Sequence, residues 1–87
     1  MTIDGSRLSL NLSTSASGFA KVVLLDEAGK ELPGFGESDA NELVGDAIDI
    51  TAAWKNAPRL ESLKSRTVRI KFLLRDADLY SFAVLDN

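Results

Sequence analysis

The sequence contains neither cysteine nor histidine in its 87 residues. Without cysteine there is no disulfide framework, and no thiolate that could ligate a metal or act as a nucleophile. Without histidine there is no imidazole general base, which excludes Ser-His-Asp catalysis and the commonest zinc sites. The side chains that remain for acid-base chemistry are mainly carboxylates, because aspartate and glutamate together number 13.

Long hydrophobic runs and clustered positive charge are absent as well. No stretch approaches the roughly 20 apolar residues that span a bilayer, and the N-terminus lacks the basic and apolar segments of a signal peptide. The net charge of −3 disfavours nucleic acid and anionic membranes as partners, because binding to either depends on clustered lysine and arginine. We therefore expect one globular domain over residues 1–87, whose apolar residues form a single small core.

Short segments of alternating apolar and polar residues predict an all-β fold. Residues 7–13 place Leu8, Leu10 and Leu12 on one face, which is the period-two pattern of a half-buried strand. Residues 19–26 are apolar at both parities, as is typical of a central strand. Further strands are predicted over residues 31–32, 47–54, 66–75 and 79–85.

The connections between these strands are also predicted from composition. Residues 76–78, Asp-Ala-Asp, are predicted to reverse the chain into a hairpin, because aspartate tolerates turn conformations. The polar segment 33–46 is expected to cross the surface as a loop. A short helical turn near 58–64, with Leu60 and Leu63 three residues apart, should close one end of the core.

About six strands, one helical turn and no βαβ spacing predict a small antiparallel β-sandwich of jelly-roll or immunoglobulin-like kind. A small barrel is the alternative. Two layers are needed because six amphipathic strands in one open sheet would leave an apolar face in water. Strand parity places Ile48, Ile50 and Trp54 in the core, and places Tyr80 on one packed face with Phe82.

Seven separated blocks of the sequence carry a resemblance to a known family. They are Asn11, Thr14-Ser15, Gly18, Pro33-Gly34-Phe35, Gly45-Asp46, Trp54-Lys55 and Asp76-Ala77-Asp78-Leu79-Tyr80-Ser81-Phe82. Over residues 7–84 the chain resembles a small β-sandwich domain appended to the C-terminal end of bacterial secreted glycoside hydrolases and related propeller proteins, notably β-fructosidase-like ones. This resemblance implies a noncatalytic accessory domain, plausibly carbohydrate-binding, in an extracellular or periplasmic location.

A sugar site is expected to place an aromatic ring against the apolar face of a pyranose, with polar groups nearby. The candidate rings are Trp54 and Tyr80, with Phe35 as a third, and each could instead be packed in the core. The polar groups also have structural alternatives. Arg69, Lys71 and Arg75 could form a solvated strand face, and Asp76 and Asp78 could cap backbone amides of a turn. The polar candidates are Arg69, Lys71, Arg75, Asp76 and Asp78.

The acidic loop is the only segment that suggests a metal. Glu37, Asp39 and Asp46, near Asn41 and Glu42, are candidate ligands for a structural calcium ion, which prefers carboxylate and carbonyl oxygens. Their spacing does not match an EF-hand loop, so a solvated acidic loop is the simpler interpretation. No cofactor is required.

These observations leave two alternative functions. The chain is either a carbohydrate-binding module for a polysaccharide or oligosaccharide, or a structural module that packs against its parent catalytic domain. An independent enzyme is not expected, because a chain this short leaves little room for a cleft with opposed carboxylates. A packing module should expose an apolar patch, for which Val23, Leu25 and Leu73 are the outward candidates. The domain is expected to be a monomer or a weak dimer, since an uncovered strand can pair with a second copy.

Overall fold

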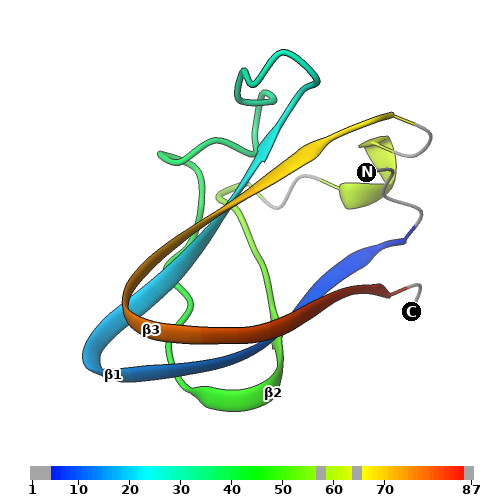
Figure 1. Cartoon of the computed structure of the whole chain (residues 1–87). Helices are drawn as coiled ribbons and strands as arrows, with labels where there is room; N and C mark the ends of the chain where they lie inside the picture. Colours follow the sequence, from blue (N-terminus) through cyan, green and yellow to red (C-terminus); the bar gives the residue numbers. More distant parts are fainter. Residues whose placement is uncertain (1–4, 57–58, 64–65, 86–87) are drawn as a thin grey trace.

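The strands form one antiparallel sheet in the order β2-β1-β3, so the all-β prediction is confirmed (Figure 1). The sheet has three long or medium strands where about six short ones were predicted. The computed structural model describes residues 5–56, 59–63 and 66–85. Its elements are β1 (Arg7–Leu25), β2 (Asp46–Thr51), the 3-10 helix η1 (Leu60–Leu63) and β3 (Arg69–Leu85).

Fewer strands result because β1 and β3 each continue through a point where a break was predicted. Thr14 lies opposite Ala77 and Phe19 lies opposite Arg75, so four residues of β1 stand against Asp76 alone. Such a mismatch is a large bulge, and it bends both strands together without ending either. The predicted hairpin turn at 76–78 is therefore wrong, because β3 bends there and does not reverse.

The bend has an identifiable backbone origin. Asp76 has a φ of 47°, in the left-handed region that aspartate tolerates better than most residues. Gly18 faces it so closely that a Cβ would collide with the backbone carbonyls of Arg75 and Asp76. The conformational tolerance of aspartate that suggested a turn is thus used to bend a pair of strands.

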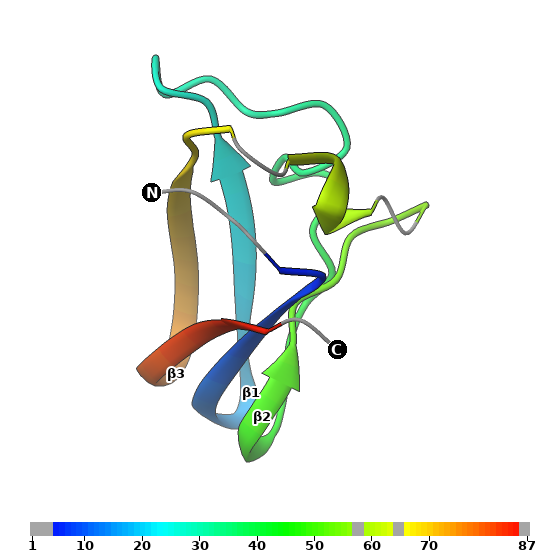
Figure 2. The ribbon, with the colours of Figure 1, turned by 90° about the vertical axis from the view of Figure 1, so that its right-hand side faces the viewer.

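The bend divides the sheet into two arms that run from it in different directions, as Figures 1 and 2 show from two sides. The first arm contains β2, residues 7–14 of β1 and residues 77–85 of β3. The second contains residues 19–25 of β1 and 69–75 of β3. Along its other side the second arm is bordered by an irregular segment, which hydrogen-bonds Ala20 through Leu43 and Leu24 through Phe35.

The core lies between the two arms. Leu8, Leu10 and Leu12 of the first arm and Val22 and Leu24 of the second are almost completely buried. η1 closes one end of this core with Leu60 and Leu63, which are also buried, so the predicted role of the helical turn is confirmed. Residues 58 and 64, which the predicted turn includes, lie outside the described residues.

Two bulges overturn the parity predictions for Ile48 and Tyr80. In β2, Ile50 lies opposite Leu10 but Ala47 lies opposite Leu12, so the strand contains one extra residue there. Ile48 is consequently 81% exposed and is not part of the core. The corresponding shift in β3 leaves Tyr80 as the extra residue, 66% exposed. One inserted residue moves a side chain to the other face of a strand, which parity alone does not reveal.

Among the described residues, no helix combines the length and the apolar character needed to cross a membrane.

Candidate functional site

The side chain of Trp54 is fixed in the core. This agrees with the prediction, made from strand alternation, that the ring packs inside the domain. Its side chain is only 7% exposed, and its indole Nε1 donates a hydrogen bond of 2.8 Å to the backbone carbonyl of Val22. The buried ring of Phe35 meets it edge-on, with 5.0 Å between ring centroids and 74° between the planes. The face of the indole is therefore not available for stacking on a sugar, and Phe35 is equally inaccessible.

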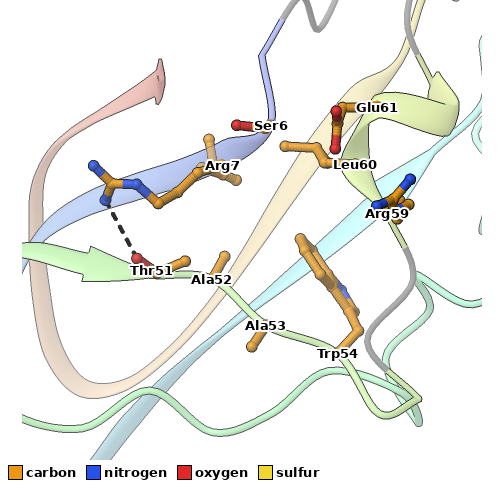
Figure 3. A pocket seen from close by; sticks show the side chains of 10 residues that line it. Ser6, Arg7, Thr51, Ala52, Ala53, Trp54, Arg59, Leu60 and Glu61 are labelled. Atoms are coloured by element: carbon orange, nitrogen blue, oxygen red, sulfur yellow. Dashed lines mark hydrogen bonds between the residues drawn. The ribbon is translucent and has the colours of Figure 1, made fainter. Parts of the chain in front are cut away.

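A pocket of about 260 Å³ nevertheless adjoins Trp54 (Figure 3). It lies where the beginning of β1, the end of β2 and η1 meet, and its polar lining includes Arg7, Thr51, Arg59 and Glu61. Sequence reasoning missed this pocket because its polar residues come from three separate segments and form no motif. None of the polar candidates predicted on β3 lines it.

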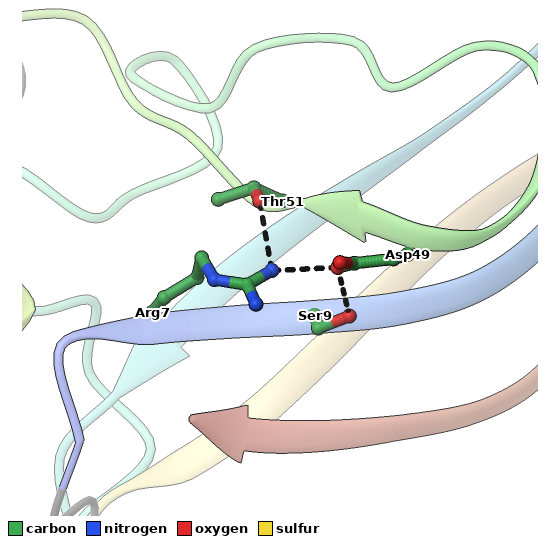
Figure 4. A network of polar contacts seen from close by, with 4 residues as sticks. All are labelled: Arg7, Ser9, Asp49 and Thr51. Atoms are coloured by element: carbon green, nitrogen blue, oxygen red, sulfur yellow. Dashed lines mark hydrogen bonds and ion pairs between the residues drawn. The ribbon is translucent and has the colours of Figure 1, made fainter. Parts of the chain in front are cut away.

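At the rim of this pocket Arg7 is held in a polar network with Asp49 (Figure 4). A guanidinium nitrogen of Arg7 donates to the carboxylate of Asp49 at 2.6 Å, and the hydroxyl of Ser9 donates to the same oxygen at 2.6 Å. The hydrogen bond from Ser9, followed by that from Arg7, lowers the pKa of Asp49 below its ordinary value. Asp49 thus stays ionised and is unsuited to act as a general acid.

The five polar candidates for sugar binding are all exposed on β3, but the bend separates them by charge. Arg69, Lys71 and Arg75 lie on the second arm, Asp76 occupies the bend, and Asp78 lies opposite Ser13 on the first arm. Within the described part of the chain, none of the five side chains makes a salt bridge or a hydrogen bond. The result is a strand that is basic before its bend and acidic after it.

β3 also carries exposed apolar side chains, which we call the β3 surface: Leu74, Tyr80 and Phe82. They are 45%, 66% and 42% exposed, respectively. Phe82 packs against Phe72, with 5.1 Å between ring centroids, so an aromatic pair joins the two arms of the strand. The predicted packing of Tyr80 in the interior is wrong, because the bulge turns its ring into solvent.

The apolar patch predicted from outward parity does not form. Val23 is completely buried, and Leu25 and Leu73 are half-buried. The exposed large apolar side chains are instead those of Val44, Ile48 and the β3 surface. Because β3 pairs with β1 alone among the described residues, this surface also borders a strand edge that has no partner there.

The acidic loop does not assemble a cluster of ligands. Among the described residues, no three acidic side chains lie close enough together to hold a metal ion, so Glu37, Asp39 and Asp46 do not form such a group. The backbone of Asp39 is used structurally: its amide donates to Gly36 and its carbonyl accepts a hydrogen bond from Lys55.

The chain is thus a small all-β domain built on a bent, three-stranded antiparallel sheet. In comparisons with protein-family models, curated proteins and solved structures, nothing matched it. The function therefore has to be argued from the surfaces of the domain itself.

Proposed function

We propose that the chain is a noncatalytic accessory domain that works by packing β3 against the surface of another protein. One observation carries this proposal. β3 is 17 residues long and all of it is described, yet none of its residues is fully buried and one of its edges has no strand partner among the described residues. Exposed apolar side chains along a long unpaired edge are a feature that soluble proteins usually cover.

Two further considerations support the proposal. The ring best suited to sugar stacking, Trp54, is committed to the core, which removes the main support for a binding face around it. The resemblance to accessory domains of bacterial secreted glycoside hydrolases implies a neighbouring catalytic domain against which β3 could pack. We also retain the jelly-roll or immunoglobulin-like class as part of the proposal, since the two arms have the core between them and so supply two layers.

The proposal is tested by placing a photo-crosslinking phenylalanine analogue at single positions of the natural gene product. Position 80 and position 74 lie on the β3 surface, whereas position 48 is equally apolar and more exposed but belongs to β2, at the opposite edge of the sheet. We expect protein adducts from positions 74 and 80 and none from position 48. Equal yields at all three positions, or none at any, would contradict the proposal.

Carbohydrate binding is the second candidate function, and the exposed ring of Tyr80 favours it. Tyr80 lies two residues from the exposed carboxylate of Asp78, so a ring and a hydrogen-bonding group occur on one strand. A glycan-array screen, run with and without calcium, separates the two functions. Binding that is lost in Tyr80→Ala would establish the sugar function, whereas no binding to fructans, glucans, xylans or acidic glycans is expected if β3 packs on protein.

A further inference from the structure

We infer that β3 pairs with β3 of a second copy of this chain, in antiparallel orientation, to give a continuous sheet of order β2-β1-β3-β3-β1-β2. This inference rests on the proposed function, because it names the occupant of the same surface. The first argument is charge. Arg69, Lys71 and Arg75 precede the bend, and Asp76 and Asp78 occupy or follow it.

A two-fold axis between Arg75 and Asp76 would set the basic half of one β3 beside the acidic half of the other. Parallel pairing in register would instead bring each basic residue next to its own copy. Because none of these side chains is engaged in a salt bridge within the described part of the chain, their charges are available to a second molecule. The strand is therefore complementary to itself in one orientation only.

The faces of the strand match in the same register. Pairing about the Arg75–Asp76 midpoint places Phe72 opposite Leu79 of the second copy and Leu74 opposite its Ala77. Phe72, Leu79 and Ala77 all pack partly against the core, so the two copies would present apolar side chains on one common face. On the other face Leu73 would oppose Asp78 of the second copy, whose carboxylate would lie diagonally between Lys71 and Arg75.

The opposite edge of the sheet lacks these properties. β2 has only six residues and carries Asp46 and Asp49 without any lysine or arginine, so pairing with its own copy would oppose like charges. Self-association is therefore expected at β3 and not at β2.

Sedimentation velocity of the whole chain over a range of concentrations tests the inference. We expect a reversible dimer whose dissociation constant rises about tenfold in Asp78→Lys, because attraction to two basic residues becomes repulsion in both halves of the interface. The double variant Lys71→Asp with Asp78→Lys should recover part of the lost affinity, because one of the two repulsions in each half of the interface becomes an attraction. Asp46→Lys makes the same charge change on β2 and should have no effect. A chain that stays monomeric, or an equal loss in Asp46→Lys, would overturn the inference.

The register is tested separately with cysteine, which the natural chain lacks. When Leu73→Cys and Asp78→Cys chains are mixed under mild oxidation, a mixed disulfide dimer should form faster than either homodimer. A mixture of Leu73→Cys with Val44→Cys is the control, since Val44 is exposed but lies outside β3. Equal rates in the two mixtures would exclude this register.

These results also separate the inference from the proposed function. A monomeric chain that still forms adducts from positions 74 and 80 with a different protein would overturn self-pairing and leave the packing function intact. A monomeric chain without such adducts would overturn both.

Discussion

β1 and β3 are paired along almost their whole lengths, from Arg7 opposite Leu85 to Leu25 opposite Arg69, yet they occupy opposite environments. β1 is bordered on its second side by β2 and then by residues of the irregular segment that ends near Leu43. It supplies much of the core, whereas none of the residues of β3, all described, is fully buried. Burial in this sheet is thus decided by a strand's position more than by its composition.

The strongest way to test this contrast is to compare the two rings that the sequence offered for sugar binding. Trp54→Ala should lower the free energy of unfolding by about 3 to 5 kcal/mol, because it empties a buried site and leaves the Val22 carbonyl without its donor. Tyr80→Ala should lower it by less than about 1 kcal/mol, because that ring is exposed. Urea denaturation measures both, and a similar loss in the two variants would contradict the structure.

A more direct comparison uses two side chains that lie opposite each other. Leu10 is completely buried and Phe82, its register partner on β3, is 42% exposed. Leu10→Ala should cost about 2 to 5 kcal/mol of unfolding free energy, and Phe82→Ala below about 2 kcal/mol in the monomer. Both are measured by urea denaturation in dilute solution. A larger loss in Phe82→Ala would mean that β3 is covered under those conditions.

The bend that both strands share is tested through two glycines. Gly18→Ala should cost about 1 to 3 kcal/mol, because the added Cβ meets backbone carbonyls of β3 that cannot move independently. Gly29→Ala is the matched control: its φ of 86° strains alanine by about 1 kcal/mol, but no atom lies near the added Cβ. Thermal unfolding of the two variants separates steric collision from backbone strain. Equal losses would indicate that Gly18 does not control the bend.

The smallest effect is expected at the β1–β2 pairing, where Asp49 joins the two strands. Its folded-state pKa is lowered by Ser9 and Arg7, so its carboxylate stabilises the fold at neutral pH. This contribution should fall as the pH drops below about 4 and vanish once the lowered pKa is passed. Wild type and Asp49→Asn should therefore differ in stability at neutral pH and converge in acid. A difference that stays constant with pH would exclude the carboxylate as its source.

Much of the fold could be predicted from the sequence, because alternation and spacing identify buried faces locally. The inward faces of Leu8, Leu10 and Leu12, the central character of residues 19–26 and the plug formed by Leu60 and Leu63 all follow from such patterns. The burial of Trp54 followed from parity in the same way.

Several of the errors share one physical origin, which is that a bulge leaves almost no local signal. A single extra residue exposes Ile48 and Tyr80, and a larger mismatch turns a predicted hairpin at Asp76 into a bend. The β3 surface could not be foreseen for a different reason, since its location depends on which strand lies at the edge of the sheet. The pocket near Arg7, Arg59 and Glu61 depends on contacts between distant segments and is invisible to pattern reasoning.

The pairing of Arg7 with Leu85 also bears on how the domain is made. The central strand is synthesised first, but the strand that borders it from end to end is synthesised last. β2 is available to the first half of β1 earlier, but the pairing of β1 is complete only when β3 has been synthesised. Because pairings between distant residues form slowly, we expect the folding rate to be low for a chain of this size.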